Sequence, residues 1–378
     1  MERIRIGDAC DILNGYAFKS DKYVEKGIRV IRIANVQKGY IEDNAPVFYP
    51  LDFSGLEKYM LEEGDLLMSL TGNVGRVALI QRNMLPAALN QRVACLRLRS
   101  NRITKGFLFH ILNSDLFEQQ CVQASNGVAQ KNMSTEWLRD YEIPLYSMEE
   151  QLKITEILDK TRRIIDLRNY ELSVLDDLIK ARFVEMFGDP QLNPFGWNVV
   201  NISEVVGDKV SNGFFAKRDD YVDNGNVSVL GVANVVNRMY SKIDGLPRTN
   251  ADAKDIEKFE VKYGDMLFCR SSLVAEGIGK ASIIPEDVQE KVLFECHVIR
   301  LPLELSKCIP EFMQALSTME YFRNQVIAQS KTATMTTIGQ DGILKTDIIL
   351  PPIDKQREFY DFVKKIDKSK FHTEENII

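Results

Sequence analysis

A chain of 378 residues has room for two or three domains, and its 45% hydrophobic and 27% charged residues are ordinary for a soluble globular protein. Six cysteines without a CxxC pair and three scattered histidines argue against a zinc site or a disulfide framework. No apolar run is long enough to span a membrane, which argues against a membrane partner. We therefore expect a cytoplasmic protein. The formal net charge of −6 argues by itself against nucleic acid, so the distribution of charge has to decide.

The first region, residues 1–147, is predicted to be one mixed α/β (α+β) domain. Alternating apolar residues predict strands at 29–36, 65–70, 76–80 and 92–99, helical spacing follows at 106–122, and a short strand is expected at 141–145. The stretch 66–114 has seven cations and no acid: Arg76, Arg82, Arg92, Arg97, Arg99, Arg102 and Lys105. These cations indicate either a local basic surface or ordinary solvated charge on one wet face of a sheet.

Residues 148–187 contain no Gly or Pro and are predicted to form one helix. Ser147 and Glu150 form a possible capping box, and Gly188 supplies a stop. A heptad seam alternates Ile154, Thr161, Arg168, Leu175 and Arg182 with Leu158, Ile165, Leu172, Ile179 and Met186. At ~1.5 Å per residue the helix is a rod of roughly 60 Å. We prefer a spacer to the alternative, a core helix of one domain, because two arginines and a threonine occupy the seam.

A turn-rich linker follows at 188–197, and the pattern of the first region then repeats. Residues 14–27 (NGYAFKSDKYVEKG) align with 212–225 (NGFFAKRDDYVDNG), and Gly64-Asp65 aligns with Gly264-Asp265, about 200 residues later. Gln151 and Gln356 are equivalent in the same way. A period of this length predicts two tandem copies of one domain, at 1–147 and 188–350. The second copy is followed by a helix in 351–378, expected from Ile353 to about Phe371, whose Phe359, Val363, Ile366 and Lys370 keep the three-four spacing.

Motifs that support catalysis are missing. Gly277 to Lys280 (GIGK) lacks the first Gly and the Ser/Thr of a phosphate loop and is expected to be a hairpin, while Asn193-Pro194-Phe195 is expected to be a plain turn. There is no GxSxG elbow and no HExxH helix, so we expect no catalytic residue, no metal and no cofactor.

Both copies carry loops with side chains that suit DNA. Asn and Gln pair with adenine, Arg pairs with guanine, and Lys binds phosphate. The candidates in the first copy are Lys19, Thr71, Asn73, Arg76, Asn90, Gln91, Arg92, Lys131 and Asn132; those in the second are Lys217, Arg218, Arg270, Ser271, Ser272, Lys280, Lys331 and Thr332. Any one of them can instead be an ordinary solvated loop residue.

Three segments carry a resemblance to a known family: EEQLKITEIL at the start of the long helix, GDPQLNPFGW after it, and PPIDKQREFYDFVKKIDKSKF near the end. In this order the chain resembles the specificity subunit of type I restriction-modification systems. The resemblance implies two target-recognition domains held apart by long helices, 148–187 and 351–378, in an antiparallel coiled coil. Each domain would read one half of a bipartite site in double-stranded DNA. One departure is expected: the second helix stops near Phe371, where the family usually continues.

The resemblance also implies partners and a role. Methyltransferase subunits would dock against the helices, restriction subunits would join through them, and the subunit itself would be non-catalytic. Two alternatives from other classes stay open. One is a self-contained DNA methyltransferase or endonuclease, which would need a cofactor pocket; the other is a coiled-coil scaffold without a DNA role, which would explain the acidic net charge.

Overall fold

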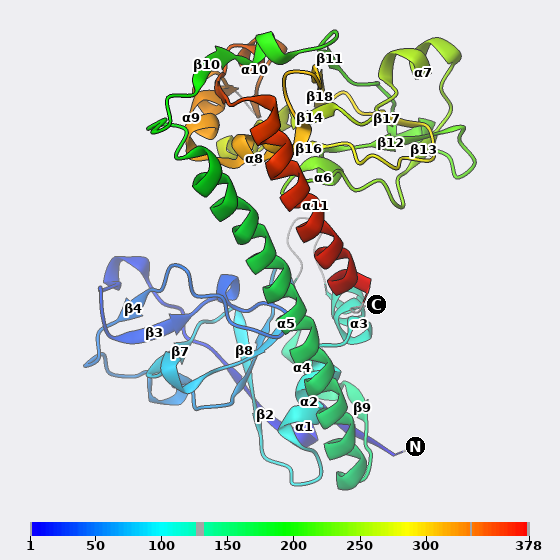
Figure 1. Ribbon diagram of the computed structural model, residues 1–378. Helices are drawn as coiled ribbons and strands as arrows, with labels where there is room; N and C mark the ends of the chain where they lie inside the picture. The colour runs from blue at the N-terminus through cyan, green and yellow to red at the C-terminus, as the bar shows by residue number, and fades with distance from the viewer. Residues whose placement is uncertain (1, 126–131, 333–334, 376–378) are drawn as a thin grey trace. The chain divides into compact units, whose positions relative to one another are not determined.

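The computed structural model describes residues 2–125, 132–332 and 335–375. The chain divides into two units, Met1–Ile165 and Asp166–Ile378, and a single helix, α5 (Met148–Phe187), belongs partly to each. The expected mixed α/β fold with two similar sheet domains joined by long helices is confirmed (Figure 1).

The first unit contains two main sheets. An antiparallel sheet has the order β2-β8-β5-β6, a smaller sheet has the order β4-β3-β7 with β3 and β7 parallel, and β1 pairs with β9. In chain order the elements are β1 (Arg3–Arg5), α1 (Ile6–Ala9), β2 (Cys10–Asn14), β3 (Ile28–Ile31), β4 (Phe48–Tyr49), β5 (Leu66–Ser69), β6 (Val77–Leu79), β7 (Ala87–Leu89), β8 (Val93–Leu98), α2 (Lys105–Leu112), α3 (Asp115–Ala124), α4 (Thr135–Asp140) and β9 (Glu142–Pro144), with 3-10 turns at Ser20–Lys22, Ile33–Asn35, Glu57–Tyr59 and Arg82–Met84.

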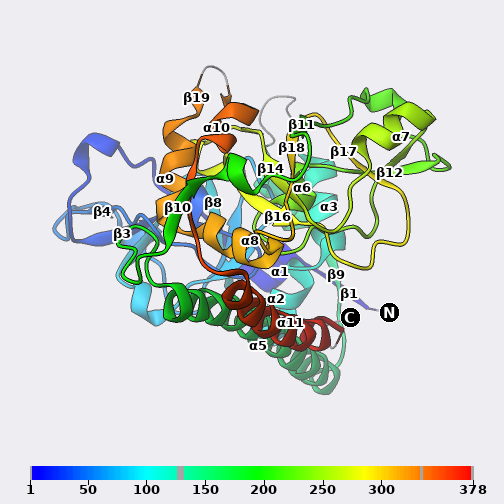
Figure 2. The ribbon, with the colours of Figure 1, turned by 45° about the horizontal axis from the view of Figure 1, so that its top comes forward.

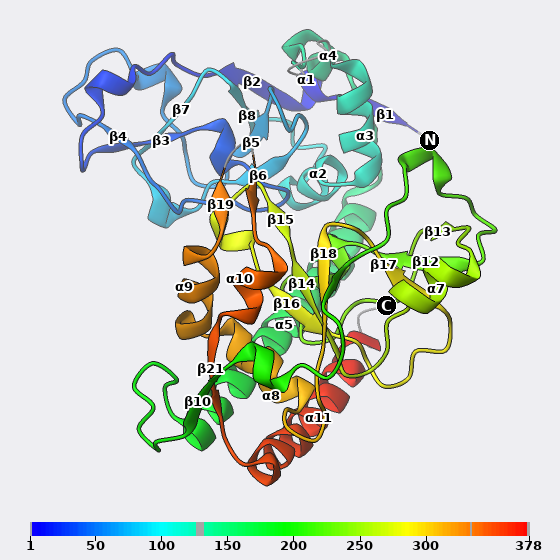
Figure 3. The same cartoon turned by 90° about the horizontal axis from the view of Figure 1, so that it is seen from above.

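The second unit repeats this order. Its sheets are β11-β18-β14-β16, β13-β12-β17 and β10-β21, and the described residues add a small sheet, β15-β20-β19 (Figure 3). The elements are β10 (Asn198–Asn201), β11 (Ser211–Asn212), β12 (Val227–Leu230), α6 (Val232–Val235), β13 (Arg248–Thr249), α7 (Ala253–Phe259), β14 (Asp265–Cys269), β15 (Ser271–Ser272), β16 (Ala281–Ile283), β17 (Val292–Phe294), β18 (Val298–Pro302), α8 (Pro310–Thr318), α9 (Glu320–Ala328), β19 (Lys331–Thr332), β20 (Thr336–Thr337), α10 (Gln340–Leu344), β21 (Asp347–Leu350) and α11 (Ile353–Glu375), with 3-10 turns at Ile202–Val205, Arg218–Asp220 and Ala275–Gly277. The internal repeat found in the sequence is therefore a repeat of topology.

The central strand of each larger sheet is apolar on both faces. In β5, Leu66 and Met68 pack in the core that α2 and α3 cover, whereas Leu67 packs in the core shared with the smaller sheet. In β14, Met266 and Leu267 divide between two cores in the same way. Successive side chains of a strand point to opposite faces, so a strand covered on both sides is mostly apolar.

Three predicted boundaries were wrong. The strand expected at 29–36 ends at Ile31 and gives way to a 3-10 turn, in which Asn35 Oδ1 accepts from the backbone N–H of Arg32 (2.9 Å). The helical stretch expected at 106–122 is two helices, because the Ser114 hydroxyl caps a new helix by accepting from Phe117 N (3.2 Å). The last helix, α11, runs to Glu375 rather than stopping near Phe371.

The long helix has the predicted bounds and the predicted caps. The Ser147 N–H donates to Glu150 Oε2 (2.9 Å), and the Glu150 N–H donates to Ser147 Oγ (3.3 Å), which is a closed capping box. Gly188 ends the helix with a φ of 77°, a left-handed conformation that favours glycine.

Helices α5 and α11 lie antiparallel within the second unit (Figures 1 and 2). Phe359 near the start of α11 contacts Phe187 at the end of α5, with ring centroids 5.6 Å apart, while Lys370 further along α11 pairs with Asp176. The seam positions Leu172, Leu175 and Ile179 are less exposed than the residues beside them on α5, and Phe359 and Val363 are fully buried. The heptad prediction is therefore confirmed for this half of α5.

One buried glutamine in each copy fixes the start of the helix that follows the domain: Gln151 in α5 and Gln356 in α11. Gln151 Oε1 accepts from Thr104 N (2.8 Å), and its Nε2 donates to Arg102 O (2.8 Å) and Tyr146 O (2.9 Å). Gln356 makes the equivalent bonds, accepting from Ile309 N (2.9 Å) and donating to the carbonyls of residues 307 (3.1 Å) and 351 (2.8 Å). The two aligned glutamines therefore have the same structural role: each forms hydrogen bonds with three backbone groups at a helix–domain junction.

Candidate nucleic-acid interface

In the first unit, three separate loops meet at the end of β5. Thr71 bridges Asn132, and the Leu70 N–H donates to Arg92 O (3.0 Å), which brings the loop after β5 beside the loop between β7 and β8. In that second loop the Arg92 N–H donates to Asn90 Oδ1 (3.2 Å). Asn73, Gln91, Arg92 and Asn132 are exposed here, whereas Thr71 is only 8% exposed and contributes mainly backbone. Lys131 lies outside the described residues.

Two other candidates of the first copy have different surroundings. Arg76 Nη1 donates to the side-chain carbonyl of Gln37, so its guanidinium is already engaged. Lys19 is exposed, but its backbone N–H donates to the Tyr49 hydroxyl (3.1 Å), in a cluster of aromatic rings that also includes Tyr16 and Phe18.

In the second unit, the small sheet β15-β20-β19 gathers four candidates. Ser271 and Ser272 pair with β20, and Lys331 and Thr332 pair with the other edge of the same strand. Arg270 leads into this sheet, and its Nη1 donates to Cys296 O (3.1 Å). Lys217 and Arg218 are exposed beyond β11, whereas Lys280 lies apart and donates to Asn237 Oδ1 (2.7 Å).

Sequence reasoning missed two apolar residues on these loops. Phe215 is 69% exposed and Leu273 is 82% exposed, and each stands within three residues of a polar candidate. Exposed apolar side chains on a DNA-reading loop can contact thymine methyl groups or wedge between bases. The available signal was the presence of large apolar residues in otherwise polar loops.

Much of the basic stretch 66–114 is neutralised by acids from elsewhere in the first unit. Arg97 Nη2 pairs with Asp65 (2.6 Å), Arg99 pairs with Asp11 (3.1 Å), and Arg102 pairs with Glu2. The hydrogen bond to Asp65 raises the pKa of Arg97 above its usual value. These three arginines are paired with acids, and Arg92 remains exposed with no carboxylate partner among the described residues.

Cys10 and Cys121 are buried thiols and not activated nucleophiles. Burial raises the pKa of Cys10 and of Cys121 to about 12, which keeps both thiols protonated at neutral pH. Among the described residues there is no group of His, Cys, Asp and Glu side chains that could hold a metal ion. The helices in the same residues include none that is long and apolar enough to cross a membrane.

Comparisons with known proteins agree with this geometry. Residues 1–176 and 194–378 match the family model described as the type I restriction modification DNA specificity domain. The chain is 23% identical to the type I restriction enzyme EcoBI specificity subunit of Escherichia coli, over 96% of this chain and 78% of that one. A shorter match, 30% identical over 45% of this chain and 41% of the relative, is to the MjaVIII specificity subunit of Methanocaldococcus jannaschii.

The fold is also similar to a solved structure. The crystal structure of the type I restriction-modification system S subunit from M. genitalium aligns with a TM-score of 0.57 at 11% identity, covering 100% of this chain and 91% of that one. The chain belongs to the type I restriction-modification DNA specificity family. It is a specificity subunit that recognises a DNA target for a type I restriction enzyme complex and is itself non-catalytic.

Proposed function

We propose that each unit reads one half of a bipartite site in double-stranded DNA, the first through the loops around Asn90–Arg92 and the second through the surface formed by Arg270 and the β15-β20-β19 sheet. The observation that carries this proposal is a repeated scaffold with unlike loops: the strand orders coincide, whereas the polar side chains that the loops display differ. Base edges are read by side chains, so two surfaces with different side chains suit two different short sequences.

The helices would hold the two readers and dock the methyltransferase subunits, through which restriction subunits join. An apolar row on the part of α5 in the second unit supports this role. Leu167, Tyr170, Val174 and Leu178 follow one another at helical spacing, are 43–70% exposed, and lie on a different face from the seam that meets α11. An exposed apolar row of this kind suits a protein partner. A cytoplasmic location goes with this proposal, because the DNA and the partners are there.

Methylome sequencing tests the proposal directly. Cells without other type I systems would express this chain together with the methyltransferase subunit of its own system, and every methylated adenine would be mapped. We expect a single bipartite motif with a fixed gap of unspecified bases. Matched cells with the methyltransferase alone provide the control and should lack the motif. A continuous motif, or the same motif in the control, would contradict the proposal.

A further inference from the structure

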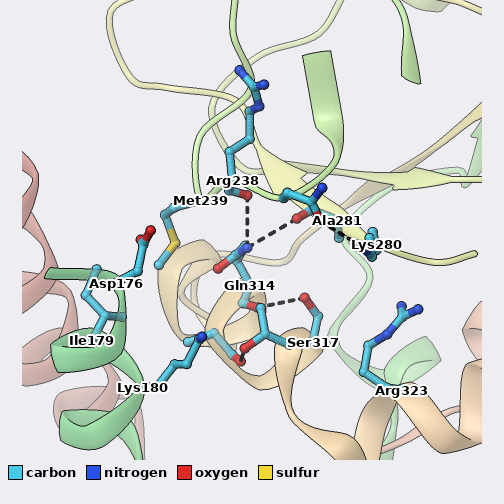
Figure 4. Close-up of a pocket in the computed structure, with 13 residues that line it drawn as sticks. Asp176, Ile179, Lys180, Arg238, Met239, Lys280, Ala281, Gln314, Ser317 and Arg323 are labelled. Carbon is cyan, nitrogen blue, oxygen red and sulfur yellow. Dashed lines mark hydrogen bonds between the residues drawn. The ribbon is translucent and has the colours of Figure 1, made fainter. Parts of the chain in front are cut away.

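The second unit has a cavity of about 360 Å³ beside α5 (Figure 4). Its walls come from four segments that are far apart in sequence: α5 near Lys180, the loop at 237–239, the start of β16 after Lys280, and the helices α8 and α9 with Gln314 and Arg323. Four of the lining residues are cations: Lys180, Arg238, Lys280 and Arg323. The Arg238 side chain points away from Gln314, whereas Lys180, Lys280 and Arg323 line the same space (Figure 4).

Lys180 pairs with Asp177 (3.3 Å), whereas Lys280 and Arg323 have no acidic partner among the described residues. Lys280 Nζ donates to the neutral Asn237 side chain (2.7 Å), and Arg323 Nη2 donates to the backbone carbonyl of Glu276 (2.9 Å). Arg323 Nη1 is buried without a hydrogen-bond partner. Among the described residues, no carboxylate pairs with Lys280 or Arg323, and the acid that lines the cavity, Asp176, is already paired with Lys370.

The equivalent place in the first unit holds an ion pair. Asn234 and Asn35 cap matching turns, so Asn237 corresponds to Lys38; Phe322 and Phe117 are matching buried residues, so Arg323 corresponds to Glu118. Lys38 Nζ binds Glu118 Oε2 (2.9 Å) and also Asp115. In the second unit the lysine is replaced by an amide and the glutamate by an arginine, so the pair is gone and a cation remains.

A partly buried guanidinium without a counter-charge is an incomplete arrangement. Removing a charge from water is costly unless it is paired, and this burial lowers the pKa of Arg323 below its usual value. A bound anion would supply the missing charge. Phosphate suits the group best, because its oxygens accept several charge-assisted hydrogen bonds at once from arginine and lysine.

We propose that this cavity binds a phosphate group, with Arg323 and Lys280 as its ligands and Lys180 at the rim. The phosphate can be free or can belong to the backbone of target DNA. The DNA source rests on the proposed function. The 3-10 turn Ala275–Gly277, whose Glu276 carbonyl accepts from Arg323, begins three residues after Ser272 of the proposed reading surface. The cavity would then hold a phosphate that flanks the second half-site.

The first arm of the test uses the full chain and inorganic phosphate. Isothermal titration calorimetry at constant ionic strength would compare the wild type with K280Q and R323Q. We expect each substitution to weaken phosphate binding about tenfold, which corresponds to ~1.4 kcal/mol. R323K, which keeps the charge, should recover part of the affinity. K254Q on α7, an exposed lysine outside the cavity, removes the same charge and should change nothing.

The second arm uses the chain assembled with its methyltransferase and a DNA duplex that carries the methylated motif. Each phosphate contact contributes about −0.9 to the slope of log K against log salt, so K280Q/R323Q should lower the magnitude of this slope by about one if the cavity holds a backbone phosphate. Weaker phosphate binding by K280Q and R323Q in the first arm supports the proposal with free phosphate as the ligand. A smaller salt slope for K280Q/R323Q in the second arm supports it with a DNA phosphate as the ligand.

If the cavity variants behave like the wild type and K254Q in both arms, the proposal is overturned. The proposed function is tested separately, by the methylated motif.

Discussion

The two units share the polar contacts that hold backbone and differ in those that face outward. Asp65 Oδ2 accepts from Glu62 N (2.8 Å), and Asp265 Oδ2 accepts from Lys262 N (2.9 Å), just as the two buried glutamines make matching bonds. In contrast, the Lys38–Glu118 pair of the first unit has no equivalent among the described residues of the second. Buried backbone groups must be satisfied in both copies, whereas exposed side chains are free to change with the target.

The largest expected effect is a loss of stability confined to the second unit. Phe183 of α5 is fully buried and contacts the rings of Phe187, Phe312 and Phe359. F183A should lower the free energy of unfolding of the second unit by about 3–5 kcal/mol, since a large cavity is left. Hydrogen exchange should show lost protection in α8 and α11 and unchanged protection in α2 and α3. Equal loss in the first unit would show that the two do not unfold separately. V184A, at an exposed neighbour, is the control.

The matched glutamines test whether the two junctions are energetically equivalent. Q151A orphans the Thr104 N–H and two carbonyls, and Q356A orphans the Ile309 N–H and two carbonyls. Each should cost its own unit about 1–3 kcal/mol. Urea unfolding monitored by hydrogen exchange would measure the loss of stability in each unit. K153A, on the exposed side of α5, is the control. A large cost in one unit and none in the other would break the equivalence.

A buried acid should make the stability of the second unit depend on pH. The first unit has no acid at the equivalent position. Burial raises the pKa of Glu311, which accepts from the hydroxyls of Tyr240 (3.1 Å) and Tyr263 (3.2 Å), and the equivalent residue of the first unit is Gly106. A raised carboxyl pKa means that the folded state binds the proton more tightly. This contribution to stability is fully present below the ordinary pKa of 4.5 and is lost as pH rises through the folded value.

E311Q keeps an oxygen that can accept from both tyrosines and removes the titration. The free energy of unfolding of the second unit should therefore fall less steeply with rising pH in E311Q than in the wild type. Denaturant unfolding at a series of pH values above 4.5 measures this. An identical pH profile in both proteins would rule out Glu311 as the source.

The smallest effect concerns the ion pair found in the first unit alone. Lys38 and Glu118 are 39% and 32% exposed, so E118Q should cost at most about 1 kcal/mol, and the difference from the wild type should shrink at high salt. Urea unfolding in low and high NaCl would show it. A difference that does not depend on salt would mean that packing, and not charge, explains the loss.

The sequence predicted the long helix and the repeat well because their signals are local or periodic. The heptads, the Ser147 capping box and Gly188 each act within a few residues, and the aligned Asn, Gly and Asp residues mark matching turns. The break in the helical stretch 106–122 was missed because apolar spacing continues through Asn113 and Ser114, and only the Ser114 cap reveals it.

The partners of charged residues could not be predicted in this way. Arg99 and Arg102 were among the cations that indicated either a basic surface or ordinary solvated charge, and the sequence did not show their acids, Asp11 and Glu2, which are about ninety to a hundred residues away. The cavity with Arg323 and Lys280 is lined by four segments that are distant in sequence, so no single stretch of sequence predicts it. Long-range pairing and burial decide these sites, and neither is visible in composition or spacing.

The most direct measurement of the central claim is the methylated motif of a domain exchange. Residues 1–147 would be replaced by the same block of a related specificity subunit with a known motif, leaving α5 and the second unit unchanged. If each unit reads one half-site, sequencing of methylated DNA should show one half of the motif changed to that of the donor, with the other half and the gap preserved. A motif in which both halves change would contradict independent reading by the two units.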